Sequence, residues 1–375
     1  MINKDRILAE FCELVRLKCS TRAEREVGDA VKAKLAAAGL SVTEDDVAAK
    51  IGGNCGNIIG YLPGNIPGAP TVMLSAHIDC VEPCTGIEPL VEDGIITSRG
   101  ATVLGADDKA GVVATLEALR VVREQGSPHG GIQVVFTVSE EGGLNGSKNM
   151  DKSLLKADFG YVLDSGGAPG RIINAAPGQN SIKVTVRGKT AHAGVAPEEG
   201  LNAIVVAGKA IAQIKQGRLD FETTANIGTI KGGTATNIVP DLVEIACEAR
   251  SRNPEKLANQ TRHMVETFEQ VAAANGAQAK VTVNKAYDPY VLAADSPVVA
   301  LVRQAAESIG LPVSLEATGG GSDANFFNTY GVPSAVLAVG MSKVHTTEEY
   351  IKVADLNGSA ELVLAIIATA AGMKK

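Results

Sequence analysis

TVMLSAHID, residues 71–79, is an uninterrupted apolar run that ends in an imidazole and, two positions later, a carboxylate. Pro70 precedes this run and Pro83 follows it. A short apolar run bounded by turn residues is typical of a buried strand in a parallel sheet. Because residues i and i+2 of a strand point to the same side, His77 and Asp79 can face one another at the strand's carboxyl end. Open α/β sheets bind their ligands at that edge.

The His77 and Asp79 pair has two interpretations. A metal-ligating histidine usually donates its other ring N–H to a carboxylate, so the pair predicts a metal ligand that its partner already orients. The alternative is a strand-end histidine hydrogen-bonded to an aspartate, with no metal. The choice depends on what else the chain brings to the same sheet edge.

The composition excludes several classes of protein. Of the 375 residues, 45% are hydrophobic, which is enough for a sizeable core in two or three domains. The formal net charge is −7, no basic run occurs and aromatic residues make up 3%, so we expect no nucleic-acid partner. No signal peptide is visible at the amino terminus, and the longest apolar stretch, 362–371, is too short to span a membrane.

The cysteines point to a reducing compartment. The six of them form no CxxC pair, so neither a zinc ribbon nor a disulfide framework is indicated. We therefore expect a soluble cytoplasmic protein with no membrane partner.

Strands alternate with helical patterns in the first half of the chain. Apolar strands are predicted over 132–139 and 161–164, and a helix over 112–123. The same alternation resumes later, with helices over 297–309 and 354–371. This order predicts an α/β fold, a mostly parallel sheet with helices on both faces.

The segment between these two parts has a different order. Residues 182–285 read strand, helix, strand, strand, helix, strand, which is the order of a ferredoxin-like α+β module. We therefore predict a metal-binding catalytic domain made of 1–178 and 291–375. Residues 179–290 are inserted into it as a second domain.

Acidic and imidazole side chains occur at further points where a strand ends, a helix begins or a loop follows. They are Asp107–Asp108, Glu140–Glu141, Asp164 and His345. Parallel strands end at one edge, so these groups converge with His77, where unpaired buried carboxylates would repel one another. Two histidines with several carboxylates suit zinc, with manganese or cobalt as alternatives. The ligand count fits two metal ions that share one carboxylate.

Each of these features also has a simpler explanation. Asp107 is able to cap the helix that follows it, with Asp108 in the first turn. Glu140 and Glu141 precede two glycines and could be solvated turn residues. Five such coincidences at one sheet edge together favour a metal centre. The spacing does not decide whether Asp107 or Asp108 is the shared ligand.

Six motifs of this chain occur together in one known family. They are HID at 77–79, GADDKAG at 105–111, SEEG at 139–142, TAHAG at 190–194, and the isolated Asp164 and His345. In these motifs the chain resembles the M20 family of di-zinc metallopeptidases, and within it the peptidase T-like tripeptide aminopeptidases. The resemblance covers nearly the whole chain. It implies a cytoplasmic exopeptidase for short peptides, with two zinc ions per chain and an inserted lid domain that forms a homodimer.

The same resemblance assigns the metal ligands to two sets that share one residue: His77 and Asp164 for one ion, Glu141 and His345 for the other, and Asp107 for both. It makes Asp79 the support of His77. It makes Glu140 the general base, which takes a proton from the metal-bridging water and passes it to the leaving amine. Neighbouring strand residues point in opposite directions, so only a turn lets Glu140 and Glu141 both face the metals.

Five residues are candidates for contacts with the substrate. His192 lies in a loop of the inserted domain, where the resemblance implies an oxyanion donor, sometimes from the partner subunit; the alternative is a surface histidine. Arg250 and Asn237 are residues of the kind that bind the substrate carboxylate or carbonyl in this family. Gly320 and Ser322 precede a predicted helix, where backbone N–H groups could cradle an anion.

The sequence therefore predicts a metal-dependent exopeptidase that removes the N-terminal residue of tripeptides. Carboxypeptidases, dipeptidases and N-acyl amino acid deacylases of the M20 family share the same metal core, so they stay open as alternatives. A metal-free binding protein on this fold is disfavoured, because every ligand position is intact.

Overall fold

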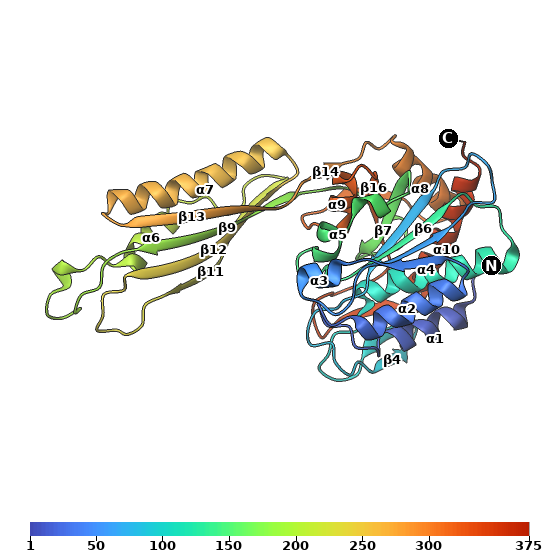
Figure 1. Cartoon of the computed structure of the whole chain (residues 1–375), viewed down its shortest axis with the longest axis horizontal. Coiled ribbons are helices and arrows are strands. Elements are labelled where there is room, and N and C mark those ends of the chain that lie inside the picture. Colours follow the sequence, from blue (N-terminus) through green and yellow to red (C-terminus); the bar gives the residue numbers. More distant parts are fainter. Residues whose placement is uncertain (375) are drawn as a thin grey trace. The chain divides into compact units, whose positions relative to one another are not determined.

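The computed structural model describes residues 1–374, which form two compact units (Figure 1). Unit 1 comprises Met1–Ala175, Leu292–Ala317 and the chain from Ser322 onward. Unit 2 comprises Ala176–Val291 and Thr318–Gly321. The second unit is therefore an insertion, and its ends lie near the predicted 178/179 and 290/291 boundaries.

A mostly parallel sheet forms the centre of unit 1. Its strands are β1 (Ser41–Glu44), β2 (Ile58–Leu62), β3 (Val72–His77), β6 (Ile132–Thr137), β7 (Phe159–Ser165), β8 (Arg171–Ala176), β15 (Ser314–Ala317) and β16 (Ser334–Ala338). They lie in the order β1-β2-β6-β3-β7-β16-β8, with β15 beside β8. The four central strands β6, β3, β7 and β16 are parallel. All six residues of β3 are buried, which explains its apolar sequence.

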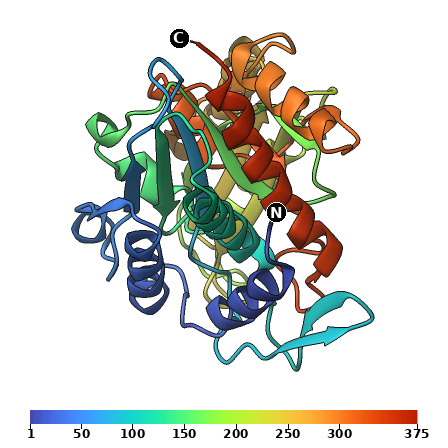
Figure 2. The ribbon, with the colours of Figure 1, turned by 90° about the vertical axis from the view of Figure 1, so that its right-hand side faces the viewer.

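Helices pack against this sheet and against one another. They are α1 (Lys4–Leu14), α2 (Arg25–Ala37), α3 (Val47–Ile51), α4 (Ala106–Gln125), α5 (Asn145–Asn149), α8 (Pro297–Ser308), α9 (Asp323–Thr329) and α10 (Val353–Ala371), with a 3-10 turn at Lys152–Leu154. Helix α4 packs against β3 and β7, and α1 and α10 pack against α4 (Figure 2). Helix α9 packs against β7 and β16. The predicted α/β fold class is confirmed.

Helix α10 has nearly the bounds predicted from the sequence, 354–371. By length and composition its 19 residues would suffice to cross a membrane, although the apolar stretch noted in the sequence covered only 362–371. Half of its most apolar window is buried inside the protein, and one such helix is weak evidence for a membrane span.

A small sheet in unit 1 was not predicted. It has the order β17-β5-β4, with β4 (Pro89–Glu92), β5 (Ile95–Ser98) and β17 (Tyr350–Lys352). These strands are at most four residues long and several of their residues are exposed, so they lack an apolar run. Strand β17 matters for the site because it closes the loop that carries His345.

Unit 2 has the predicted βαββαβ order, with two additional strands of two residues each, β10 and β14. Its elements are β9 (Gly178–Arg187), α6 (Ala203–Ile211), β10 (Gly217–Arg218), β11 (Thr223–Gly232), β12 (Leu242–Ser251), α7 (Pro254–Ala274), β13 (Gln278–Tyr287) and β14 (Tyr290–Val291), with a 3-10 turn at Pro197–Glu199. The antiparallel sheet has the order β10-β11-β12-β9-β13. Asn202 and Asn253 cap α6 and α7. Both helices pack against the sheet over a core that includes Val184, Ile245 and Phe268.

Candidate metal centre

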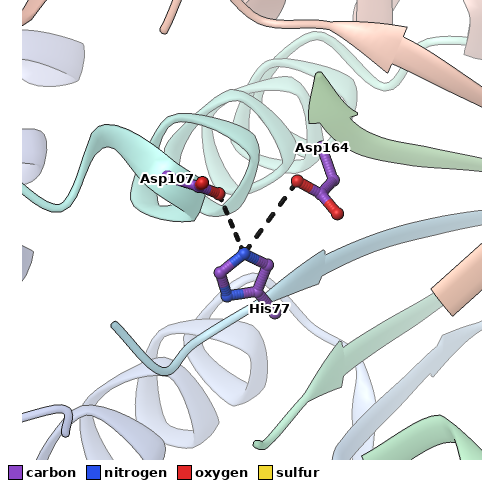
Figure 3. Close-up of side chains that lie close together, drawn as sticks. All are labelled: His77, Asp107 and Asp164. Atoms are coloured by element: carbon purple, nitrogen blue, oxygen red, sulfur yellow. Dashed lines mark hydrogen bonds and ion pairs between the residues drawn. The ribbon is translucent and has the colours of Figure 1, made fainter. Parts of the chain in front are cut away.

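His77 is the last residue of β3, and its ring faces the carboxylates of Asp107 and Asp164 (Figure 3). Its Nε2 lies 2.9 Å from Asp107 Oδ1 and 4.0 Å from Asp164 Oδ1. Its Nδ1 lies 3.2 Å from the carbonyl oxygen of Asp79 and 3.4 Å from Asp79 Oδ1. The ring therefore turns one nitrogen to the acidic cluster and the other to Asp79, as in an oriented metal ligand.

The start of α4 gives the two adjacent aspartates different partners. Asp107 contacts His77 through Oδ1, and its Oδ2 lies 3.3 Å from His345 Nε2. Asp108 accepts backbone N–H groups instead, from His77 at 3.3 Å and from Gly111 at 3.2 Å. Both aspartates depart from helical φ and ψ, so their side chains diverge. Asp107, and not Asp108, lies between the two histidines.

The two glutamates follow β6 in a turn. Ser139 has a φ of 52°, so the chain changes direction immediately before them. The carboxylate of Asp79 accepts the N–H of Glu140 at 3.0 Å and that of Glu141 at 3.2 Å. Because the turn replaces regular strand geometry, both glutamates offer an oxygen within 4.8 Å of a ring nitrogen of His77.

His345 reaches the cluster from the loop between β16 and β17. Its Nε2 lies 2.9 Å from Glu141 Oε1 and 3.3 Å from Asp107 Oδ2. The side chain is 53% exposed, whereas that of His77 is 1% exposed. One end of the cluster is therefore enclosed and the other is open to solvent.

These contacts define groups whose ligand atoms all lie within 4.8 Å of one another. One group is His77, Asp107 and Asp164, and another is Asp107, Glu141 and His345. The two groups share Asp107. A third combines His77 with Glu140 and Glu141. Nitrogen and carboxylate donors in such sets fit zinc and similar divalent ions.

The electrostatics of the cluster also fit bound cations. Burial, and then the charge of Asp164, raises the pKa of Glu140 well above its usual range. Burial and the charge of Asp107 do the same to the pKa of Asp164. Hydrogen bonds with Asp107 and then Glu141 raise the pKa of His345 to about 10. The cluster thus retains protons on groups that metal ions would deprotonate, and divalent ions would offset the carboxylate charge.

Three buried carboxylates that the sequence did not single out hold the backbone around the cluster. They are Glu24, Asp323 and Glu349. Glu24 Oε1 accepts the N–H of Ser139 at 3.0 Å. Asp323 accepts the hydroxyl of Thr137 at 2.5 Å. Glu349 accepts N–H groups at the start of α4. Asp323 is the first residue of α9, and Glu24 and Glu349 lie between elements. A single acidic residue at such a position carries no periodic signal that would mark it as buried.

Glu24 should make stability depend on pH. Its side chain is fully buried, and burial raises its pKa from 4.5 to about 7. Between these values the folded state binds a proton that the unfolded state has released, so stability falls as pH rises from about 4.5 to about 7. The glutamine of Glu24→Gln cannot ionise. Its free energy of unfolding relative to wild type should therefore rise by up to ~3 kcal/mol across this interval and stay constant at higher pH.

Thermal unfolding of wild type and Glu24→Gln, compared at a series of pH values, measures this difference. A constant difference between the two proteins from about pH 4.5 to about pH 7 would show that Glu24 titrates normally in the folded state.

His192 belongs to unit 2, in the loop after β9. Its Nδ1 accepts the backbone N–H groups of Gly194 and Val195, each at 3.2 Å. These bonds select the neutral tautomer with its proton on Nε2. The residue is exposed, so its Nε2–H is suited to an acceptor outside its own loop.

Arg250 and Asn237 also lie in unit 2. Arg250 Nε and Nη2 donate to Glu248 at 2.8 and 3.0 Å, so a substrate carboxylate would have to compete with or share this pairing. Asn237 is exposed, and its backbone carbonyl accepts the N–H of Ala193 at 3.0 Å. Its amide side chain lies at the surface.

Gly320 and Ser322 are engaged in the turn before α9. The N–H of Gly320 donates to Thr318 Oγ1 at 3.2 Å, and that of Ser322 donates to Asn325 Oδ1 at 3.0 Å. The hydroxyl of Ser322 accepts the N–H of Ala324 and completes the cap of α9. Both N–H groups expected to bind an anion are therefore bonded within this turn.

Comparison with known proteins gives consistent matches along the chain. The sequence profile of peptidase family M20/M25/M40 matches residues 73–369. The structure of aminopeptidase PepT from Bacillus cereus ATCC 10987 is 47% identical, with 99% of each chain covered and a TM-score of 0.93. That of a tripeptidase from Staphylococcus aureus is 42% identical, with 100% of each chain covered and a TM-score of 0.96. Peptidase T from Escherichia fergusonii is 25% identical over 83% of this chain and 85% of its own.

Proposed function

Because this chain belongs to peptidase family M20/M25/M40, we propose that it is a metal-dependent exopeptidase that removes the N-terminal residue of tripeptides. Its similarity to an aminopeptidase and to a tripeptidase over nearly the whole of each chain supports this activity. The observation that carries the proposal is the pair of ligand groups that share Asp107.

We assign His77 and Asp164 to one divalent ion, Glu141 and His345 to the second, and Asp107 to both. Zinc is the ion we propose, with manganese or cobalt as alternatives, because the donors are imidazole nitrogens and carboxylate oxygens. Two ions bound there supply Lewis acidity and lower the pKa of a nearby water molecule.

Other residues perform the proton transfer and hold the substrate. Glu140 accepts the proton of the attacking water and passes it to the leaving amine. Asp79 accepts the Nδ1 proton of His77, which leaves Nε2 as the ligand atom. His192 donates its Nε2 proton to the oxygen on which negative charge develops. Arg250 and Asn237 bind the polar ends of the peptide.

A panel of short peptides with free and blocked ends tests the proposed activity. We expect cleavage after the first residue of tripeptides, faster than cleavage of dipeptides or tetrapeptides, and no cleavage after N-acetylation. Release of the C-terminal residue, or hydrolysis of N-acyl amino acids, would favour the carboxypeptidase or deacylase alternatives. Both alternatives would leave the metal assignments standing.

Metal analysis tests the centre itself. Protein prepared with excess zinc should contain two divalent ions per chain, because two ligand groups share Asp107. Elemental mass spectrometry after gel filtration measures this ratio. Less than one ion per chain, with activity intact in a strong chelator, would contradict the assignment.

We further infer a cytoplasmic homodimer that forms through the inserted unit, residues 179–290, which also serves as a lid. Three large apolar side chains of unit 2 support this inference because they are exposed: Ile204 (42%), Val205 (50%) and Ile230 (51%). Strand β10 pairs only with Thr224 and Ala225 of β11. Within residues 1–374, the rest of β11 therefore forms a sheet edge suited to a second copy. All six cysteines are free thiols, which agrees with a reducing compartment.

A further inference from the structure

Glu349 is a buried carboxylate that binds the backbone of another segment through both of its oxygens. The residue is 2% exposed. Its Oε2 accepts the N–H groups of Leu104 and Gly105, each at 2.8 Å, and its Oε1 accepts the N–H of Asp107 at 3.0 Å. A carboxylate with three backbone donors, removed from water, fixes the segment it binds.

The bound segment is the start of α4, where backbone N–H groups have no partner within the helix. Gly105 occupies the N-cap position with a φ of 75° and has no side chain to offer. Asp108 accepts the N–H of Gly111 farther along, so Leu104, Gly105 and Asp107 depend on another acceptor. Glu349 supplies that capping carboxylate from a remote part of the chain. Because Glu349 does so, the carboxylate of Asp107 is not needed as a cap and points to the two histidines instead.

Glu349 also belongs to the loop that carries His345. This loop is closed at its ends by backbone hydrogen bonds between Ser342 and Tyr350, at 3.0 and 3.1 Å. Inside it, the N–H of Glu349 donates to the carbonyl oxygen of Thr346 at 3.1 Å. His345 itself has a φ of 62°, so its position depends on this closed loop. Glu349 therefore joins the loop of one proposed ligand to the backbone of another.

We propose that Glu349 is a positioning residue that sets the separation of His345 and Asp107, and thereby the affinity of the metal position that these two share with Glu141. This inference rests on the proposed function, since it assumes that the cluster holds metal. The other position, at His77 and Asp164, also includes Asp107 but not His345, and its His77 has a support of its own in Asp79. The effect of Glu349 should therefore be larger at the position of His345 than at that of His77.

Glu349→Gln tests this asymmetry. Glutamine has a single acceptor oxygen, and its NH₂ group would face backbone N–H donors, so the two segments should separate. We expect the dissociation constant for one zinc ion to rise about 10–100-fold. The constant for the other ion should rise less, because only Asp107 connects that position to Glu349. Stepwise zinc titration of chelator-treated protein by calorimetry measures both constants. Activity at limiting zinc should fall and should recover in excess zinc.

Glu117→Gln is a matched control. Glu117 is also a fully buried carboxylate, and it lies on α4, the helix whose start Glu349 binds. It too accepts a remote backbone N–H, that of Asn3 at 2.7 Å. Its Oε1 and Oε2 accept hydrogen bonds from Asn3 and Arg6, and neither of these residues is a proposed metal ligand. We expect Glu117→Gln to lower the melting temperature without changing either zinc dissociation constant.

Glu349→Asp provides a second variant if Glu349→Gln does not fold. It keeps the charge but shortens the side chain by one methylene, so it should produce the same selective loss of one ion. The inference is overturned if a folded Glu349 variant binds both ions as wild type does, or if both dissociation constants rise by the same factor. A wild-type protein that binds fewer than two ions would instead overturn the proposed function.

Discussion

Glu140→Ala should lower turnover by about 10²–10⁴-fold while two metal ions per chain remain bound. The carboxylate of Glu140 lies in the cluster beside His77, but neither of the two ligand groups that share Asp107 includes it. Its removal deletes the proton transfer from water to the leaving amine. Because that interaction acts in the transition state, kcat and kcat/KM should fall together. Steady-state kinetics and metal analysis of one preparation measure both quantities.

His345→Ala is the matched control in the same cluster. It should lose metal as well as activity, because Nε2 of His345 lies 2.9 Å from Glu141 and 3.3 Å from Asp107. The comparison separates a proton-transfer residue from a ligand. If Glu140→Ala loses a metal ion and Glu141→Ala keeps both, the two glutamates have exchanged roles.

The cluster was predictable from the sequence because its members stand at the ends of buried strands. All residues of β3 and β6 are buried, and their sequences are mostly apolar. A histidine or an acid that ends such a run is conspicuous, and parallel strands bring these ends to one edge. His77 and Glu141 are examples, and His345 was placed with them because it lies in the loop after a predicted strand. The family motif then assigned their roles as ligands.

The choice between neighbouring acids depends on backbone geometry that spacing does not contain. Asp107 and Asp108 differ because both leave helical φ and ψ and so point in different directions. Glu140 and Glu141 both reach His77 because the turn at Ser139 interrupts the strand. Regular periodicity would have placed one of each pair away from the site.

Apart from Asp79, the residues that hold the ligands in place were not predictable. Glu349 lies 242 positions from Asp107, and Glu24 lies 115 positions from Ser139. Contacts at such separations follow from the topology of the whole unit. No local pattern marks an acid that accepts backbone N–H groups, whereas a metal ligand at a strand end interrupts a visible run.

His192→Ala should lower kcat by about 10²–10³-fold, change KM modestly and leave the metal content unchanged. The hydrogen bonds from Gly194 and Val195 to Nδ1 place the ring proton on Nε2, where a neutral imidazole can donate it to a developing oxyanion. His192 belongs to unit 2, whereas every proposed metal ligand belongs to unit 1. Its loss should therefore affect the transition state and not the metals. Full activity of His192→Ala would make it an ordinary surface histidine.

Mixing two inactive variants tests which subunit supplies this histidine. If His192 acts across the proposed dimer, a mixed dimer of His192→Ala and Glu140→Ala chains contains one complete site, with Glu140 from the first chain and His192 from the second. Random exchange makes half of the dimers mixed, so the mixture should recover about one quarter of wild-type activity per site. If chain exchange is demonstrated by mass spectrometry and no activity returns, His192 serves its own chain, because neither chain of the mixed dimer then has both residues.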